Sequence, residues 1–303
     1  MPFWPIKKDR GDLGGYEMRV RILSGFVVAL IFAVVVFSPP FAMAILVLFA
    51  TITGLYEFGR ALRQKDIHID LYLAYVGALL LVLGAYSSGA SDPLFQNLSD
   101  KAWVFISYFS KTFLIAGLLY LFTKFIFGKG KPGTRMEDIS YTLLSIAYIP
   151  LLLSFAVLTR VLDRGLEYTW FIIIGSSVTD VFAYFVGVKF GKHKIVPDIS
   201  PKKTVEGSIG GMVGCMLVMV AYGILFVNRM PGEPIHWLHF AFIGLLCGIV
   251  SQLGDWTASA FKRITGIKDF GRLIPGHGGI MDRVDSFLFV APTVYIYIEL
   301  FLR

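Results

Sequence analysis

The stretch from Ser251 to Ser286 reads SQLGDWTASAFKRITGIKDFGRLIPGHGGIMDRVDS. It begins inside an apolar run, passes through a segment dense in charge, and leads into another apolar run. Asp255 belongs to the first run, whereas Asp282 and Asp285 follow a His-Gly-Gly turn. Carboxylates, basic side chains and flexible glycines therefore occur together at the edge of apolar segments, a combination suited to a cation and phosphate groups.

The composition of the whole chain indicates an integral membrane protein. Of the 303 residues, 56% are hydrophobic and 16% are charged, whereas a typical soluble domain is about 25% charged. The net charge of +7 is expected where cytoplasmic loops collect Lys and Arg, so it does not indicate nucleic acid. Cys215 and Cys247 both lie in apolar runs, and we predict neither a disulfide nor a metal site from them.

The apolar runs predict an all-α, polytopic protein with about nine transmembrane helices, since a span needs about 17–25 mostly apolar residues. The expected spans lie near residues 22–38, 41–61, 70–88, 102–127, 139–161, 167–190, 208–227, 238–261 and 286–302. We divide the chain into a leader (1–21), N-terminal membrane helices (22–135) and a C-terminal catalytic membrane region with cytoplasmic signature loops (136–303).

The distribution of basic residues predicts the orientation. With the N-terminus in the cytoplasm, most of the 28 Lys and Arg residues fall in the leader and in the loops that follow the even-numbered spans. Basic residues accumulate on the cytoplasmic side of membrane proteins. This bias supports an odd number of spans and places the charged segment after residue 261 at the cytoplasmic face.

An ionisable group inside a membrane span is costly and suggests function, and two acidic residues within expected spans stand out. Asp180 shares a helix face with small residues, and the alternative is a buried Asp that pairs with a neighbouring helix. Asp255 belongs to a stripe with Gln252, Ser259 and Lys262, which point to one face at helical spacing. The alternative there is a purely structural polar seam.

The loop between the sixth and seventh spans contains Ser200-Pro201-Lys202-Lys203-Thr204. Its adjacent ammonium groups are good partners for phosphate, and Ser200 or Thr204 could contact a phosphate oxygen. Glu206 and several glycines open the next helix, whose N-terminus favours anions. An ordinary basic loop is the alternative, and the P-loop pattern GxxxxGK[ST] is absent from the sequence.

The segment after the eighth span interleaves acidic residues with basic ones, which a basic loop alone does not explain. Asp255 and Asp282 could supply carboxylate ligands for Mg²⁺, which also takes water and substrate phosphates. His277 has no second His or Cys at zinc spacing, so a zinc site is not expected. A general-acid, phosphate-contacting or structural role for His277 stays open. We interpret the segment as a site where a metal-bound nucleotide meets a lipid.

The same segment resembles the signature of phosphatidate cytidylyltransferases, also called CDP-diacylglycerol synthases. The pattern is S-x-x-K-R-x4-K-D-x5-P-x-H-G-G-x-x-D-R-x-D, and it runs from Ser259 to Asp285 without departure. The resemblance continues upstream through Gly254-Asp255, the S-P-K-K-T-x-E-G loop that starts at Ser200, and the D-x-x-A-Y-x-x-G helix at Asp180. It covers about the C-terminal half of the chain.

The resemblance implies an all-helical membrane enzyme, usually a homodimer, that converts CTP and phosphatidate to CDP-diacylglycerol and pyrophosphate with Mg²⁺ and a monovalent ion such as K⁺. It implies a bacterial-type cell membrane, with the active site facing the cytoplasm. Asp255 and Asp282 take the family's metal-ligand positions. We expect catalytic roles for Asp255, Asp282, Lys262, Arg263, Lys268 and Asp285. We expect substrate and phosphate contacts from Ser200, Lys202, Lys203, Thr204, Ser259, His277, Gly278, Gly279, Arg283 and Asp180.

Other functions compete with this one. A cytidylyltransferase for another membrane lipid, or a CTP-dependent polyprenol kinase, would use related chemistry, although the long signature argues against the kinase. A secondary transporter would also carry acidic residues in membrane helices. It would not need the Pro-Gly-His-Gly-Gly turn within a cluster of carboxylates and basic groups. A purely structural membrane protein is the least favoured alternative.

Overall fold

The computed structural model describes residues 10–88 and 100–302, and within these ranges the chain is helical and contains no β-strand. The expected all-α class is therefore confirmed. The helices are α1 (Arg10–Phe37), α2 (Pro40–Leu62), α3 (Leu71–Ser87), α4 (Asp100–Phe127), α5 (Met136–Ile146), α6 (Leu152–Arg160), α7 (Gly165–Phe190), α8 (Val205–Leu225), α9 (Trp237–Thr265) and α10 (Met281–Phe301).

Among the described residues, six helical segments are long and apolar enough to cross a membrane. They are Pro40–Lys65, Met136–Arg160, Gly165–Phe190, Val205–Arg229, Trp237–Thr265 and Met281–Phe301. Three shorter apolar helices cover Leu23–Phe37, Leu71–Ser87 and Ile115–Phe127. Each expected span overlaps one of these segments, although the apolar helix Ile115–Phe127 covers only the second half of the expected span 102–127. The count of nine membrane crossings stays a prediction.

Two helix boundaries differ from the expected ones. α1 begins at Arg10, so part of the predicted leader is helical, and residues 1–9 of that leader lie outside the described residues. α10 begins at Met281 rather than near residue 286. Asp282 therefore lies in the first helical turn, where the helix dipole favours a negative charge, and Asp285 lies one turn further along the same helix.

The span from Met136 to Arg160 is interrupted by one π-helical turn, Ala147–Leu151, which joins α5 to α6. This turn contains Pro150, which has no N–H to donate and therefore interrupts the regular hydrogen-bond ladder. Tyr148 and Ile149 in the turn are buried, so the irregular segment directs its side chains into the core.

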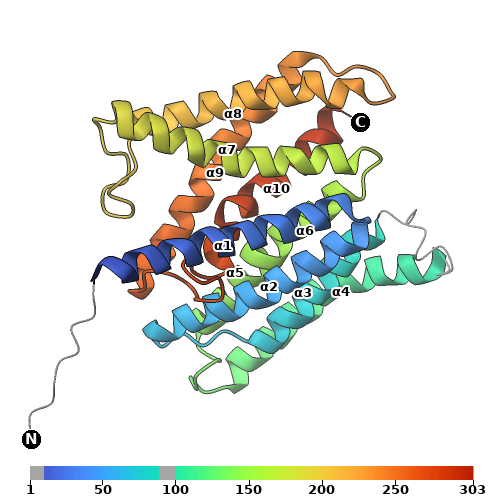
Figure 1. The fold of residues 1–303 in the computed structure, drawn as a ribbon. Helices are drawn as coiled ribbons and strands as arrows, with labels where there is room; N and C mark the ends of the chain where they lie inside the picture. The colour runs from blue at the N-terminus through green and yellow to red at the C-terminus, as the bar shows by residue number, and fades with distance from the viewer. Residues whose placement is uncertain (1–9, 89–99, 303) are drawn as a thin grey trace, which may run out of the picture.

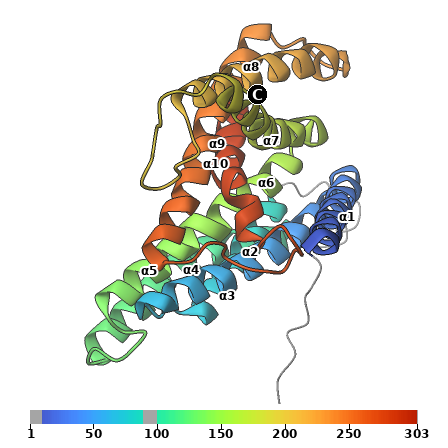
Figure 2. The ribbon, with the colours of Figure 1, turned by 60° about the vertical axis from the view of Figure 1, so that its left-hand side comes forward.

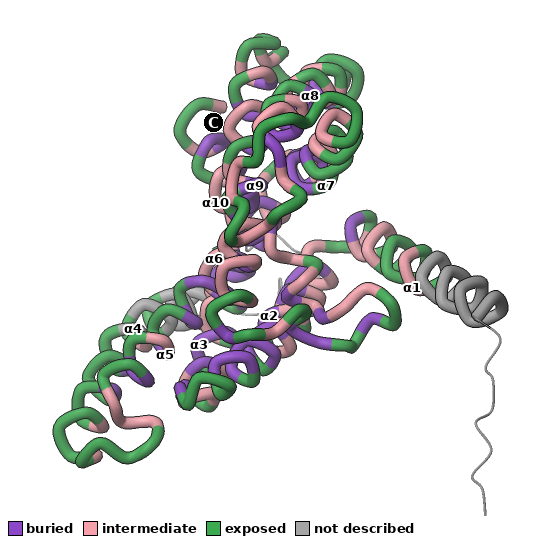
Figure 3. Tube along the Cα trace, turned by 90° about the vertical axis from the view of Figure 1, so that its left-hand side faces the viewer, coloured by how far each residue is buried: buried purple, intermediate pink, exposed green. Residues whose placement is uncertain are grey.

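The helices form two groups with a pair between them, as Figures 1, 2 and 3 show from three sides. α7 and α8 pack together on one side, and α2, α3 and α4 pack together on the other. α9 packs against α8 and α10, while α10 also contacts α2, α6 and α7. The pair α9–α10, which carries the signature segment, therefore connects the two halves of the chain.

Glycines allow α9 to approach α8 closely. A Cβ atom added at Gly244 would come within 2.8 Å of Met216 Cα, and one added at Gly248 would come within 2.8 Å of Met212 Cα. Gly244 and Gly248 are one turn apart on α9 and form a small-xxx-small pair, which brings helix backbones together in membranes. This contact fixes the position of α9 relative to α8.

Gly244→Val or Gly248→Val should lower thermal stability, because the added methyl groups meet backbone rather than a flexible side chain. We expect a loss of about 1–3 kcal/mol for each change, typical of overpacking. Ile249→Val is the matched control, since Ile249 is 40% exposed. The measurement is thermal unfolding in detergent, and equal melting temperatures for Gly248→Val and the control would contradict the tight contact.

Candidate active site between α7, α9 and α10

Lys203 forms the first part of the site by pairing with carboxylates from two membrane helices. Its Nζ lies 2.9 Å from Asp255 Oδ2 on α9 and 3.7 Å from Asp180 Oδ1 on α7. Burial opposes the charged form of Lys203, but the negative charges of Asp255 and Asp180 outweigh it and raise the pKa of this ammonium. The charge of Asp285 acts in the same direction, so negative charge from three carboxylates favours the ammonium form of Lys203.

The loop that carries Lys203 is held at both ends. Glu206 accepts hydrogen bonds from the backbone N–H groups of Lys192 (3.0 Å) and His193 (3.2 Å), and its other oxygen lies 2.6 Å from His193 Nδ1. Thr204 Oγ1 caps α8 by accepting from the Gly207 N–H at 3.2 Å. These bonds shape the loop before any ligand binds.

Arg263 supports the same loop from α9, because its Nε donates to the Ile199 carbonyl at 3.1 Å. The predicted phosphate loop and the predicted signature segment are therefore in direct contact, although about 60 residues separate them in the sequence. Arg263 carries further donors on its guanidinium that a phosphate could share.

Asp282 is the centre of the second part of the site. Its Oδ1 lies 2.9 Å from Lys262 Nζ, and its Oδ2 accepts from the N–H groups of Phe270 (2.9 Å) and Gly279 (3.0 Å). Its side chain is only 5% exposed. A carboxylate so enclosed must be paired. Its pairing with Lys262 and with two loop N–H groups holds the chain between α9 and α10 against α9.

The structure explains why glycine occupies position 278 in the His-Gly-Gly turn. Gly278 has φ of +89°, a conformation that other residues rarely adopt. A Cβ atom at this position would also come within 2.9 Å of Asp282 Oδ2. The turn therefore brings the backbone close to the Asp282 carboxylate. That Gly278 and Gly279 also let a ligand approach the backbone stays a prediction.

Glu57 of α2 is a part of this arrangement that the sequence motifs do not predict. It is buried, and its two oxygens accept from the N–H groups of Ile280 (3.2 Å) and Met281 (2.9 Å). The available signal was an acidic residue inside an apolar span, the same signal that drew attention to Asp180 and Asp255. Glu57 lies more than 200 residues before Ile280 and Met281 in the sequence, so no local pattern connects it to the signature.

The remaining predicted site residues lie at several places around the two ion pairs. His277 Nδ1 lies 3.0 Å from Ser24 Oγ on α1, and Arg283 Nε donates to the His277 carbonyl at 3.1 Å. Gln252 of the polar stripe is structural, since its Nε2 donates to the carbonyls of Ser208 and Gly248. Lys202 and Lys268 are exposed, while Ser200 and Ser259 are half-buried.

The carboxylates suit a hard divalent cation such as Mg²⁺ by their chemistry, since it prefers oxygen ligands. Asp255 pairs with Lys203 and Asp282 with Lys262, so each expected metal ligand has an ammonium partner that a cation would displace or join. Within residues 10–88 and 100–302, no three His, Cys, Asp or Glu side chains are grouped to hold a metal ion by themselves. Substrate phosphates and water would therefore complete the coordination.

Among the described residues, the buried polar atoms that form no hydrogen bond include Tyr148 Oη, Trp256 Nε1 and Ser286 Oγ. Trp256 and Ser286 directly follow Asp255 and Asp285 in sequence.

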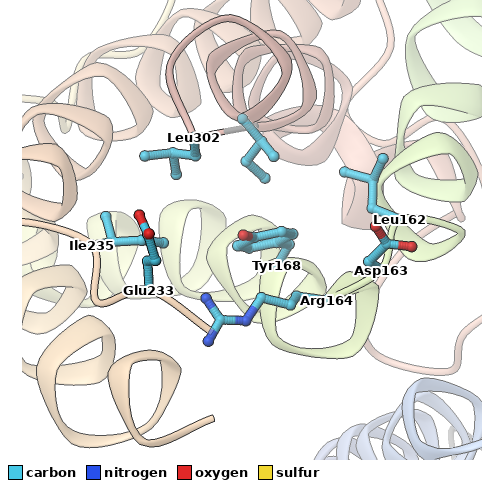
Figure 4. Close-up of a pocket in the computed structure, with 8 residues that line it drawn as sticks. Leu162, Asp163, Arg164, Tyr168, Glu233, Ile235 and Leu302 are labelled. Atoms are coloured by element: carbon cyan, nitrogen blue, oxygen red, sulfur yellow. The ribbon is translucent and has the colours of Figure 1, made fainter. Parts of the chain in front are cut away.

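A separate cavity of about 230 Å³ lies at the opposite ends of the helices, between the α6–α7 turn, the segment before α9 and the end of α10. Figure 4 shows Arg164, Tyr168 and Glu233 around it. Arg164 donates to the carbonyls of Val227, Met230 and Pro231 and so has a structural role there. The cavity contains no residue of the signature, and we do not assign the substrate site to it.

Fold and site together define a polytopic helical membrane protein with a cluster of carboxylates and lysines at one end of its membrane helices. A family model described as "Cytidylyltransferase family" matches residues 19–301, and the chain belongs to this family. It is 32% identical over 286 residues to the phosphatidate cytidylyltransferase of Bacillus subtilis (strain 168), covering 94% of this chain and 99% of that protein. It is 33% identical over 279 residues to the enzyme of that name from Staphylococcus haemolyticus (strain JCSC1435), covering 92% and 98%.

Lys203→Met should destabilise the protein by about 1–2 kcal/mol, because Asp180 and Asp255 lose their shared partner. Asp180→Asn in the same chain should restore part of the loss. Since the fold raises the pKa of Lys203, this stabilisation is present through neutral pH and is lost as the pH rises beyond about 10.4, the usual lysine value.

Thermal unfolding of the single and double variants at pH 7.5 measures the coupling, with the exposed Lys192→Met as the control. Strict additivity of the Lys203 and Asp180 effects would argue against an energetic interaction between the two side chains.

Proposed function

We propose that the protein transfers the cytidylyl group of CTP to phosphatidate, which yields CDP-diacylglycerol and pyrophosphate. The observation that carries this proposal is the convergence of Lys203, Asp255, Lys262 and Asp282 at one end of membrane-spanning helices. The family to which the chain belongs, and the names of its relatives, support a nucleotidyltransferase with a lipid acceptor.

The reaction needs little acid–base chemistry. An oxygen of the phosphatidate phosphate attacks the α-phosphorus of CTP, and the bond from that phosphorus to the oxygen bridging the α- and β-phosphates breaks. The leaving group is pyrophosphate, which keeps the bridging oxygen and its electron pair. The attacking phosphate is already anionic near neutral pH, so catalysis depends on positioning and on charge neutralisation.

The lysines and arginines can provide that neutralisation. Lys203 and Lys262 lie inside the site, each held by a carboxylate at 2.9 Å, so their ammonium groups are placed in advance. Lys202, Arg263 and Arg283 are exposed at its edge, where they can attract the anionic substrates. Asp255 and Asp282 would hold Mg²⁺, which would supply further positive charge to neutralise the substrate phosphates.

The position of the site in the membrane is also part of the proposal. We infer nine membrane crossings with the N-terminus in the cytoplasm, so that the signature end of α7, α9 and α10 faces the cytoplasm and receives CTP. Phosphatidate reaches the same end laterally from the bilayer. We expect a homodimer and a site for a monovalent cation such as K⁺ from the family resemblance alone.

Cytidylyl transfer to another membrane lipid is the main competing function, because it would use the same phosphate chemistry at the same membrane edge. A CTP-dependent kinase would release CDP rather than pyrophosphate. A transporter would require no CTP turnover, and membership in the cytidylyltransferase family argues against it.

Purified protein in detergent with phosphatidate, CTP and Mg²⁺ should release pyrophosphate, while ATP in place of CTP should not support release. Asp282→Asn should lower the rate by about 10²-fold or more, as expected for loss of a group that places charge in the transition state. Removal of Mg²⁺ with a chelator should abolish release, and added Mg²⁺ should restore it.

Glu137→Gln is the control for this assay, because Glu137 is an exposed acid at the start of α5, outside the cluster. CDP as the product would establish a kinase instead. If pyrophosphate were released only with another lipid acceptor, that lipid would take the place of phosphatidate in the proposal. If a folded sample did not bind CTP, the proposal would be overturned altogether.

The orientation can be tested with single cysteines at exposed loop positions. Lys131→Cys should react with a membrane-impermeant maleimide only from the cytoplasmic side, and Glu233→Cys only from the opposite side. The native Cys215 and Cys247 are buried, so they should contribute little background. Labelling of both positions from the same side would contradict the proposed topology.

A further inference from the structure

Glu57 of α2 forms a contact between the two halves of the chain at the start of α10. Its carboxylate accepts from the N–H groups of Ile280 and Met281, at 3.2 and 2.9 Å. The residue is 4% exposed. Asp282 is the next residue after these two donors, so Glu57 fixes the backbone from which the expected metal-ligand side chain projects.

Two glycines on the signature loop admit the Glu57 carboxylate. A Cβ atom added at Gly271 or at Gly279 would overlap Glu57 Oε1. Neither position has the positive φ that alone would require glycine. The close approach of this acidic side chain is therefore the structural reason for glycine at both positions.

Neighbouring residues of α2 contact the same loop. One guanidinium nitrogen of Arg60 donates to the Phe270 carbonyl at 2.7 Å, and the Phe58 ring lies 6.2 Å from that of Phe270 and 5.0 Å from that of Phe261. The Phe270 N–H in turn donates to Asp282 Oδ2. The α2 segment Glu57–Arg60 thus holds both backbone segments that donate to Asp282.

We propose that Glu57 is a positioning residue for the reaction, acting through Asp282 and Lys262 rather than on substrate. This inference rests on the proposed cytidylyl transfer. Glu57 holds the loop 270–281 so that Asp282 keeps its two amide donors and its pairing with Lys262. Without that support the loop loosens, and the carboxylate loses the fixed orientation that a cation and phosphates require.

Glu57→Gln tests the proposal with little change in volume. The Gln amide keeps one acceptor oxygen, but its NH₂ group faces a backbone N–H that it cannot satisfy. We expect kcat to fall by about 10- to 100-fold, the range for groups that orient metal ligands. KM for CTP should stay near the wild-type value, and half-maximal activation should require more Mg²⁺. Gly279→Ala, which displaces Glu57 from the opposite side, should reproduce these effects.

Amide hydrogen exchange provides a readout independent of activity. In the full-length Glu57→Gln protein, with neither nucleotide nor Mg²⁺ added, the peptide covering residues 270–281 should exchange faster than in the wild type. Exchange in the 191–204 loop should be unchanged. A wild-type exchange rate across 270–281 would overturn the proposal.

Asp138→Asn is the matched control. Asp138 is also a fully buried carboxylate that accepts from loop amides, those of His68 (2.7 Å) and Gly133 (2.9 Å), but these loops carry no signature residue. It should lower the melting temperature without shifting the Mg²⁺ activation curve. An equal shift in Asp138→Asn and Glu57→Gln would reduce Glu57 to a purely structural residue. If the wild type transferred no cytidylyl group while Glu57→Gln still loosened the loop, the proposed function would fail and the positioning of Asp282 would stand.

Discussion

The ion pair between Lys262 and Asp282 is the contact on which the site depends. The loop between α9 and α10 has no strand or helix of its own, and its fold follows from the need to satisfy one nearly buried carboxylate. Lys262 satisfies one oxygen, and the N–H groups of Phe270 and Gly279 satisfy the other. An unpaired charge at this depth would be costly, so the loop is drawn back against α9 and the start of α10.

A second carboxylate extends this constraint to the N-terminal half of the chain. Glu57 satisfies two N–H groups at the start of α10, which have no partner inside the helix. Its position on α2 makes the first membrane helices part of the site's framework, although the signature lies wholly in the C-terminal half. The same half-chain also supplies Ser24, which contacts His277.

Much of the fold and part of the site could be predicted from the sequence. Long apolar runs specify membrane helices because the bilayer forces the backbone to bond within each segment, and six of the expected runs meet that criterion among the described residues. The contact of Asp255 with a lysine follows from the cost of burying charge. The choice of Lys203 rather than Lys202 does not follow, because it depends on how Glu206 and Arg263 shape the loop.

Neither the start of α10 nor the role of Glu57 could be derived from a local sequence pattern, because both depend on a contact between residues far apart in the chain. Asp282 and Asp285 look like loop residues in a sequence window, since charge usually ends an apolar span. Their helical conformation depends on a carboxylate more than 220 residues away and on the glycines that admit it. A long-range hydrogen bond leaves no periodic trace in the sequence. It can be anticipated only by asking which distant polar group would satisfy the amides at the helix start.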